Sequence, residues 1–504
     1  MAHSSLVLDP RFSLADVDRR LFGSFVEHMG RCVYTGIFEP DHPTADESGF
    51  RGDVLELVRE LGPTLVRYPG GNFVSSYRWE DGVGPVEERP QRLDLAWRAL
   101  EPNTFGLNEF MAWAGVAGVE PMMAINLGTR GVAEACDLVE YSNHPGGTYL
   151  SDLRRSHGVK DPHDIKLWCL GNELDGPWQV GQKTAHEYGR LAAEAGKAMR
   201  LVDPSIELVA VGSSHSGMAT FASWEATVLE HTYGVVDYIS LHTYYEQHDD
   251  DVESFLATAT DMDMFIDAVI ATADHVGARL RQRKKLRLAF DEWNVWYQQR
   301  FVGVRNLDWQ YARPLIEDNF TVVDAVVVGS YLISLLNHAD RVAIACQAQL
   351  VNIIAPILTE PGGVAWRQTI FYPFAQAARF ARGRVLRPLI ESSSYPTARF
   401  GEVPMLHATA TYDDETGELS LFAVNRSTTE TLPLTADVRG FGALQVADHS
   451  VLADDDLQAR NTADQPDRVV PRRGSGARLT DGELTVGLPP ASWNVLRLTP
   501  APAG

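Results

Sequence analysis

Two glutamates in matching contexts are the residues of this 504-residue chain best suited to chemistry. Glu173 closes the run IKLWCLGNE, and Glu292 is the last residue but one of the run LRLAFDEW. Each run is short and apolar, as a buried β-strand is, and each is followed by loop-like residues and a helical pattern. Two carboxylates that face one bond can serve as acid/base and as nucleophile, which is the chemistry of retaining glycoside hydrolysis. The pattern therefore predicts that these two distant glutamates meet at one site.

An alternation of strand and helix patterns would position the two carboxylates. From about residue 20 to 385, amphipathic helical segments separate eight candidate strands, at 21–28, 63–70, 120–128, 165–173, 206–213, 235–242, 286–293 and 341–349. Eight strands with helical crossovers indicate a (β/α)8 (TIM) barrel, in which the C-terminal strand ends face the active site. The glutamates fall at the predicted ends of strands four and seven.

The pattern changes after roughly residue 385. Segments such as LHATATYDDETGELSLFAVNRS alternate in polarity and contain turn residues, which is typical of antiparallel strands. We therefore predict two domains. The catalytic barrel would span 18–385, and a jelly-roll-like all-β sandwich would combine 1–17 with 386–504.

Composition limits the partners and the compartment. The net charge of −23 argues against nucleic acid and against an anionic membrane, whereas a neutral sugar is compatible with it. The N-terminal segment lacks the features of a secretion signal, and no apolar stretch approaches the length of a membrane span. The four cysteines match no zinc or redox motif. We therefore expect buried free thiols and a cytoplasmic protein.

Longer motifs resemble a known enzyme family. In chain order they are FVEHMGRCVYTGIFEP, LVRYPGGNF, LAWRALEPNTFGLNEFM, CLGNELDGPWQ, LHTYYE, DEWNVWY and AQLVNIIAPI. They resemble the signature blocks of the α-L-arabinofuranosidases of glycoside hydrolase family 51, from about residue 20 to 375. GNE alone would resemble only the wider clan of glycosidases with catalytic glutamates on strands four and seven, but GNELDGPWQ and DEWNVWY together are specific.

The resemblance implies a retaining mechanism in two steps. Glu173 would protonate the glycosidic oxygen, while Glu292 would attack the anomeric carbon and form a covalent arabinofuranosyl-enzyme. Glu173 would then activate water for hydrolysis. Because the two groups need opposite protonation states, we expect the charge of Glu292 to raise the pKa of Glu173. The carboxyl groups should lie ~5–5.5 Å apart.

The resemblance also implies residues that bind the sugar, namely Glu27, Asn72, Asn172, Tyr244, Gln349, Trp97 and Trp296. Arg67 and His242 would support the carboxylates by charge-assisted hydrogen bonds. For both of them, and for Asn172, a purely structural role is also compatible with the sequence.

The sequence leaves the partners of two further residues open. Glu27 could bind sugar or form a salt bridge with Arg31 or Arg67, and Tyr245 is the rival of Tyr244 as the residue that holds Glu292. Four tryptophans lie in or beside predicted loops at the catalytic end of the barrel, where some would line the pocket and others belong to the core: Trp97, Trp178, Trp293 and Trp296.

The sequence thus predicts a retaining, exo-acting α-L-arabinofuranosidase. It would remove terminal non-reducing α-L-arabinofuranosyl residues from arabinan- or arabinoxylan-derived oligosaccharides. The same barrel could instead serve an endo-β-glucanase, a β-xylosidase or another furanosidase, whereas a non-catalytic carbohydrate-binding protein is disfavoured because both glutamates are present. No cofactor and no metal are expected, since two carboxylates suffice for the reaction. The resemblance also suggests a homo-oligomer, with a hexamer as one form.

Overall fold

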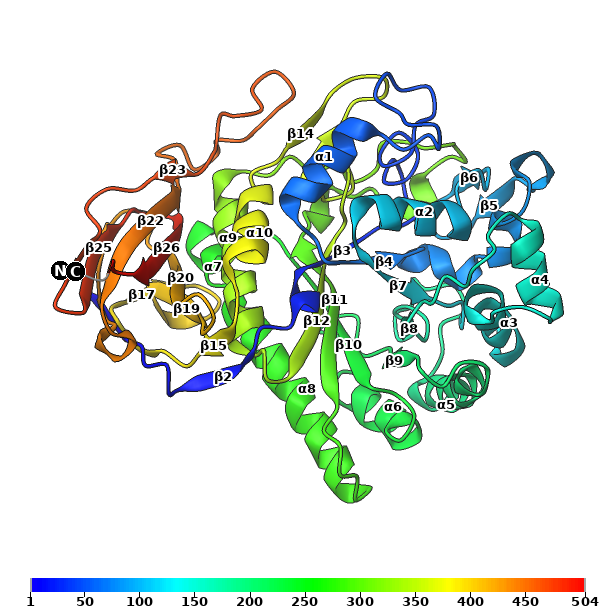
Figure 1. The fold of residues 1–504 in the computed structure, drawn as a ribbon, viewed down its shortest axis with the longest axis horizontal. Helices are drawn as coiled ribbons and strands as arrows, with labels where there is room; N and C mark the ends of the chain where they lie inside the picture. Colours follow the sequence, from blue (N-terminus) through cyan, green and yellow to red (C-terminus); the bar gives the residue numbers. More distant parts are fainter. Residues whose placement is uncertain (1, 503–504) are drawn as a thin grey trace.

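The centre of the molecule is a closed barrel of parallel strands (Figure 1), seen in a computed structural model that describes residues 2–502. Within these residues the barrel has eight strands: β3 (Gly23–Phe25), β4 (Leu65–Tyr68), β7 (Glu120–Ala124), β8 (Leu167–Cys169), β9 (Glu207–Ala210), β10 (Tyr238–Tyr245), β11 (Arg287–Val295) and β12 (Val342–Ala348). They neighbour one another in this order, and β12 pairs with β3 to close the barrel. Each strand coincides with one of the apolar runs, because parallel strands buried on both faces are continuously apolar. The predicted (β/α)8 barrel is confirmed.

Strands β10 and β11 run farther than the sequence pattern suggested. β10 ends at Tyr245 and β11 at Val295, so Tyr244 and Glu292 lie inside strands rather than at or beyond their ends. The two strands remain paired to their last residues, and Tyr244 lies opposite Asn294. The expectation about these strand ends was therefore wrong, because backbone pairing continues past the point where apolar side chains give way to polar ones.

Helices surround the barrel (Figure 1). They are α1 (Gly52–Leu61), α2 (Leu107–Ala117), α3 (Val132–Asn143), α4 (Tyr149–Ser156), α5 (Ala185–Val202), α6 (Ser223–Thr232), α7 (Val252–Leu256), α8 (Ala259–Arg279), α9 (Val322–Asn337) and α10 (Phe371–Phe380). Helix α9 is buried along almost its whole length, because it lies between the barrel and the C-terminal sheets. A helix covered on all sides is apolar all round, as its sequence VVDAVVVGSYLISLLN is. Gly329 of α9 packs so closely against Trp493 that an added Cβ would collide with the indole.

Beyond α9 stand two packed sheets (Figure 1). One has the order β16-β1-β21-β25-β24, with β1 (Ser4–Val7), β16 (Leu389–Ser392), β21 (Leu432–Asp437), β24 (Arg478–Thr480) and β25 (Glu483–Leu488). The other has the order β2-β15-β19-β20-β26-β22-β23, with β2 (Ser13–Asp16), β15 (Arg384–Leu386), β19 (Leu406–Asp413), β20 (Glu418–Asn425), β22 (Leu444–Leu452), β23 (Arg472–Arg473) and β26 (Ser492–Pro500). Strands β1 and β2 join these sheets from the N-terminal end of the chain. The predicted C-terminal β-structure is thus confirmed, while the boundaries at 17/18 and 385/386 stay a prediction.

Three short antiparallel strand pairs lie outside the barrel and the two sheets. They are β5 (Arg92–Asp94) with β6 (Ala99–Glu101), β13 (Ile357–Thr359) with β14 (Ala365–Arg367), and β17 (Ser394–Thr397) with β18 (Gly401–Pro404). Within residues 2–502 the cysteines are all free thiols, and no helix is long and apolar enough to cross a membrane.

Candidate active site

Glu173 and Glu292 meet in a cavity of about 640 Å³. Glu173 follows β8 in a tight turn, with a positive φ of 44° after a φ of 104° at Gly171. Positive φ is uncommon outside glycine, and such strained backbone is concentrated at functional sites. Ligand-type oxygens of the two carboxylates lie within 4.8 Å of one another. This approach agrees with the ~5–5.5 Å of retaining glycosidases rather than the ~6.5–9.5 Å of inverting ones.

His242 lies between the two carboxylates. Its Nδ1 is 3.0 Å from Oε1 of Glu173 and 3.1 Å from Oε2 of Glu292, and its Nε2 is 3.3 Å from Oδ1 of Asp291. Burial alone would lower the pKa of His242, but the three carboxylates raise it to about 10. The carboxylates therefore favour the protonated ring, whose charge offsets part of the negative charge around it.

The two glutamates are in different electrostatic environments. Burial is the main cause that raises the pKa of Glu173, and the charge of Glu292 raises it further, against the hydrogen bond from His242. The expected effect of Glu292 is therefore present, although burial is the larger cause. Glu292 instead receives a charge-assisted bond from Arg67, 3.2 Å from its Oε2, and a hydroxyl bond from Tyr244, 2.7 Å from its Oε1. Glu173 is thus favoured as the protonated partner.

Arg67 is buried and contacts several polar residues of the site. Besides Glu292, its guanidinium donates to Oδ1 of Asn172 at 2.7 Å and lies 3.1 Å from Oδ2 of Asp291. The amide of Asn172 in turn donates to Oδ1 of Asn72 at 3.3 Å. One arginine therefore connects the strand-seven carboxylates with the two asparagines that the resemblance assigned to the sugar.

The structure distinguishes the contacts of the two adjacent tyrosines. The hydroxyl of Tyr244 reaches Glu292, whereas that of Tyr245 donates to Asp261 at 2.9 Å. Successive side chains of a strand point in opposite directions, so only one of the pair can reach Glu292. Tyr244 also packs edge-on against Trp296, with ring centroids 5.2 Å apart.

Glu27 closes one end of the cavity with neutral partners. Its carboxylate accepts from the backbone N–H of Phe73, the indole N–H of Trp97 and the amide of Gln349, at 2.9, 2.9 and 3.0 Å. Burial raises the pKa of Glu27 to about 8 despite these bonds. A salt bridge from Glu27 to an arginine is ruled out: Arg31 pairs with Glu317, and Arg67 pairs with the strand-seven carboxylates.

Gly70 and Gly71 are needed for the packing of Glu27. An added Cβ on Gly70 would lie 2.7 Å from Cγ of Glu27, and one on Gly71 would lie 2.7 Å from its Oε2. A glycine turn beside a predicted sugar site is ordinarily expected to let the backbone approach the ligand closely. In the structure these glycines make room for a buried carboxylate.

Of the four tryptophans expected near the site, three line the cavity and one belongs to the hydrophobic core. Trp97, Trp178 and Trp296 line the cavity, and the indole N–H of Trp178 donates to Oε2 of Glu173 at 2.7 Å. Trp293 is fully buried and packs edge-on against Tyr331, so it belongs to the core. Of the other expected residues, Glu27, Asn72, Tyr244 and Gln349 line the cavity; Asn172, Arg67 and His242 are buried next to lining residues, and Asn172 is bonded to Asn72.

Several residues of the site were not among those expected. Asp291 holds both Arg67 and His242, and these two cations keep the pKa of Asp291 below its ordinary value against the effect of burial. Its position directly before Glu292 in the sequence could have indicated that Asp291 belongs to the site. Further cavity residues had no signal in the sequence, including the 214–217 loop, Asp261 and Arg399.

The same groups could be read as metal ligands. One nitrogen of His242 and one oxygen each of Glu173 and Glu292 lie within 4.8 Å of one another. These groups already have partners within the protein: both ring nitrogens of His242 face carboxylates, Arg67 and Tyr244 donate to Glu292, and Trp178 donates to Glu173. The donor set therefore fits an ionised hydrogen-bond network better than a metal site.

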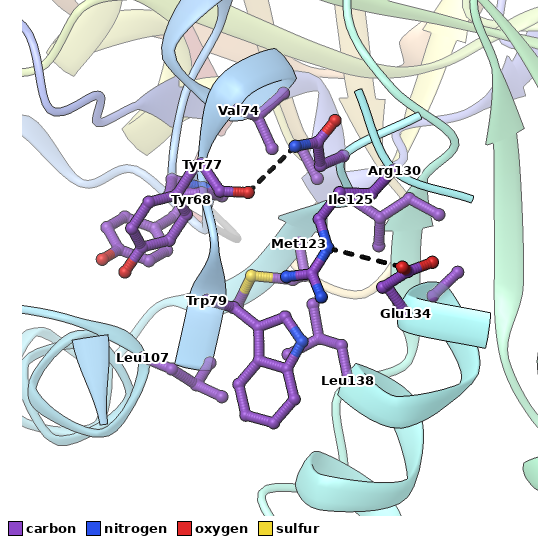
Figure 2. Close-up of a pocket in the computed structure, with 14 residues that line it drawn as sticks. Tyr68, Val74, Tyr77, Trp79, Leu107, Met123, Ile125, Arg130, Glu134 and Leu138 are labelled. Carbon is purple, nitrogen blue, oxygen red and sulfur yellow. Dashed lines mark hydrogen bonds and ion pairs between the residues drawn. The ribbon is translucent and has the colours of Figure 1, made fainter. Parts of the chain in front are cut away.

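A second cavity, beside strands β4 and β7, does not fit a sugar. Figure 2 shows it between Tyr68, Trp79, Met123 and Arg130, with Glu134 of α3 beside the guanidinium. Its volume of about 30 Å³ matches about one water molecule. The larger cavity is therefore the candidate active site.

Comparison with known proteins agrees with this geometry. Residues 57–262 match the α-L-arabinofuranosidase 1 domain, and residues 291–492 match the α-L-arabinofuranosidase C-terminal domain. The chain is 62% identical to an intracellular exo-α-(1→5)-L-arabinofuranosidase of Streptomyces lividans, over 100% of this chain and 76% of that protein. It belongs to the family 51 α-L-arabinofuranosidases.

Two further relatives bear on the fold and on the substrate. A solved family 51 α-L-arabinofuranosidase of Bifidobacterium longum superposes with a TM-score of 0.95 at 46% identity, covering 99% of both chains. An exo-α-(1→6)-L-arabinofuranosidase of the same organism is 51% identical over 99% of this chain and 98% of its own. The family resemblance and the prediction of a glycoside hydrolase are thus confirmed.

Proposed function

We propose that this family 51 enzyme is a retaining exo-α-L-arabinofuranosidase in which Glu173 is the acid/base and Glu292 the nucleophile. The observation that carries the proposal is the pair of buried carboxylates, within 4.8 Å of each other, in unlike environments. Burial and the charge of Glu292 favour the protonated form of Glu173, while Arg67 and Tyr244 donate hydrogen bonds to Glu292.

The reaction proceeds by double displacement. In the first step, Glu292 attacks the anomeric carbon while Glu173 transfers its proton to the departing glycosidic oxygen. In the second step, the ionised Glu173 takes a proton from water, and the resulting hydroxide displaces Glu292 from the sugar. His242 contacts both carboxylates, so its positive charge stabilises whichever of them is ionised.

The arabinofuranosyl ring occupies the end of the cavity bounded by Glu27, Trp97 and Gln349. These three side chains are connected by hydrogen bonds, which closes that end and favours exo action on a terminal residue. Asn172 binds the hydroxyl next to the anomeric carbon, where a hydrogen bond can strengthen in the transition state. Asn72 and Trp296 complete the binding surface, while Arg67 and His242 orient the carboxylates.

The substrates we propose are short arabinan- or arabinoxylan-derived oligosaccharides inside the cell. We propose α-(1→5) links as the preferred ones, in line with the name of the Streptomyces lividans relative. The Bifidobacterium longum relative named for α-(1→6) links makes that isomer the comparison substrate. We also propose a homo-oligomer, with a hexamer as one form, which sedimentation velocity of the purified protein tests.

The first experiment measures hydrolysis of aryl α-L-arabinofuranoside, β-D-xyloside, β-D-glucoside and β-D-galactofuranoside. Wild type is compared with Glu173→Ala, Glu292→Ala and the control Glu194→Ala, whose carboxylate is 46% exposed on α5. We expect preference for the arabinofuranoside, lost in the first two variants and retained in the control. Activity mainly on another glycoside would refute the substrate, and full activity of either site variant would refute the catalytic pair.

Azide distinguishes the two roles. In Glu292→Ala, azide replaces the missing nucleophile and gives the β-azide, with inversion at the anomeric carbon. In Glu173→Ala, azide attacks the covalent intermediate and gives the α-azide, with net retention. The opposite pairing of products with variants would reverse the assignment.

A further inference from the structure

The active-site cavity extends well beyond the catalytic pair. One end is closed by Glu27, Trp97 and Gln349, but the wall also includes residues of other segments, among them 214–217, 298–304 and Arg399. The volume of about 640 Å³ is in the range of drug-sized ligands and exceeds what a single pentose needs. The extra space must therefore accommodate a different part of the substrate.

Part of this distant wall comes from the C-terminal region of the chain. Arg399 lines the cavity, although it lies in the turn between β17 and β18, far in sequence from the barrel strands. The backbone N–H of Arg399 donates to Oγ of Ser254 at 3.2 Å, and the hydroxyl of Tyr395 donates to the backbone oxygen of Glu253 at 3.1 Å. These bonds attach the hairpin to helix α7 and hold its tip at the cavity.

Apolar packing fixes the same hairpin. Tyr395 and Val403, one from each of its strands, are buried against Ala257, which follows α7. Phe400 packs on this cluster, and the guanidinium of Arg399 lies over its ring, 5.5 Å from the centroid. The position of Arg399 is therefore set by a packed contact between the C-terminal region and the barrel, not by a free loop.

The guanidinium of Arg399 is available for a ligand. In the part of the chain that the structure describes, no carboxylate lies within 4.0 Å of it, and its side-chain nitrogens donate no hydrogen bond to the protein. Arg31 and Arg67, in contrast, are each committed to carboxylates. Arginine presents five donors in a planar fork, which suits neighbouring oxygen atoms of a ligand.

The neighbouring wall residues indicate a neutral, hydroxyl-rich ligand. Asp261 and Glu246 line the same region and supply acceptors, while His248 and Gln298 add further polar groups. An anionic ligand would be repelled by the two carboxylates, and an apolar one would leave the polar groups unpaired. Sugar hydroxyls donate to carboxylates and accept from a guanidinium, so they satisfy both.

We propose that Arg399 and its β17–β18 hairpin form a distal subsite that binds the second or third sugar of the leaving oligosaccharide. The proposal rests on the proposed function, because the sugar to be cleaved occupies the end near Glu27. It makes a hairpin of the C-terminal region part of substrate recognition. The enzyme then distinguishes oligosaccharides by length through a residue that touches neither catalytic carboxylate.

The test compares kcat/KM for an aryl α-L-arabinofuranoside with that for α-(1→5)-arabinobiose, arabinotriose and arabinotetraose. The variants are Arg399→Ala and Arg399→Lys. The control is Arg387→Ala, which removes another exposed arginine of the C-terminal region that does not line the cavity. Thermal unfolding of each variant verifies that the hairpin remains packed.

We expect wild-type kcat/KM to rise from arabinobiose to arabinotetraose. Arg399→Ala should lower kcat/KM for arabinotetraose by about tenfold, which corresponds to about 1.4 kcal/mol, with less than a twofold change for the aryl glycoside. Arg399→Lys should recover part of the loss, because it keeps the charge without the planar fork. Arg387→Ala should match wild type on every substrate.

Three results would overturn the distal subsite. They are a wild-type kcat/KM that does not depend on chain length, an equal loss on the aryl glycoside and the tetrasaccharide, and no loss on either. In each of these cases the wild-type enzyme still cleaves arabinofuranosides, so the proposed function stands. Failure of the proposed function is a different outcome, since wild type would then cleave none of the four substrates.

Discussion

Removal of one hydrogen-bond donor from Glu173 should move the pH dependence of the enzyme in a defined direction. The indole N–H of Trp178 donates to Oε2 of Glu173 at 2.7 Å, and this bond favours the ionised carboxylate. Trp178→Phe keeps an aromatic ring that can stack on His215 but removes the donor. The pKa of Glu173 should therefore rise above its already raised position.

The direction of the effect on rate follows from the role of the proton. In the proposed mechanism Glu173 must be protonated when the glycosidic bond breaks, so kcat/KM is expected to fall as pH rises through the pKa of this group. A higher pKa keeps the acid form present at higher pH. The basic limb of the profile should therefore move upward in Trp178→Phe.

The size of the effect can be bounded from the bond that is lost. A hydrogen bond to a charged group contributes about 1.5–3 kcal/mol, and about 1.4 kcal/mol corresponds to a tenfold change in an equilibrium. Trp178 is 47% exposed, so water can replace part of the lost interaction. We therefore expect the lower end of the range, a displacement of the basic limb by about one pH unit.

The assay is kcat/KM between pH 4 and 9 for an aryl arabinofuranoside and for arabinobiose. Because kcat/KM reports the free enzyme, the limb should move equally for both substrates. The control is Trp309→Phe, since Trp309 is 38% exposed and lies outside the cavity. A limb that stays in place or moves downward in Trp178→Phe would refute the electrostatic reasoning about Glu173.

Two further substitutions test the support of the site and of the barrel. Gly71→Ala should lower kcat/KM by about 10- to 100-fold, because its Cβ would lie 2.7 Å from Oε2 of Glu27 and overpacking costs about 1–3 kcal/mol. The control is Gly115→Ala, whose added Cβ would meet no atom within 4 Å. Equal activity of both variants would contradict this reasoning. Arg20→Ala should destabilise the fold by about 1 kcal/mol while kcat/KM stays unchanged, because Arg20 bridges Glu120 and Glu207 at the opposite end of the barrel. Thermal unfolding measures that loss, and an unchanged melting temperature would show that the bridge contributes nothing.

The fold was predictable because its signals are local. A strand buried on both faces is a continuous apolar run whatever it packs against, and the eight runs were visible for that reason. The ends of β10 and β11 were not predictable, because pairing with neighbouring strands extends them into polar residues. Only the structure shows that helix α9 is buried because the C-terminal sheets cover it.

Some features of the candidate site were likewise predictable from the sequence, and others were not. The sequence by itself determined that a glutamate belongs to the segment of strand four and another to that of strand seven, and hence that Glu173 and Glu292 could form a catalytic pair. Only the tertiary structure decided which side chains touch: Tyr244 rather than Tyr245 on Glu292, and neutral donors rather than arginine on Glu27. Arg399 reaches the cavity solely because a distant hairpin packs on helix α7. Contacts of this kind depend on strand register and on how separate elements pack, and no local sequence pattern determines either of them.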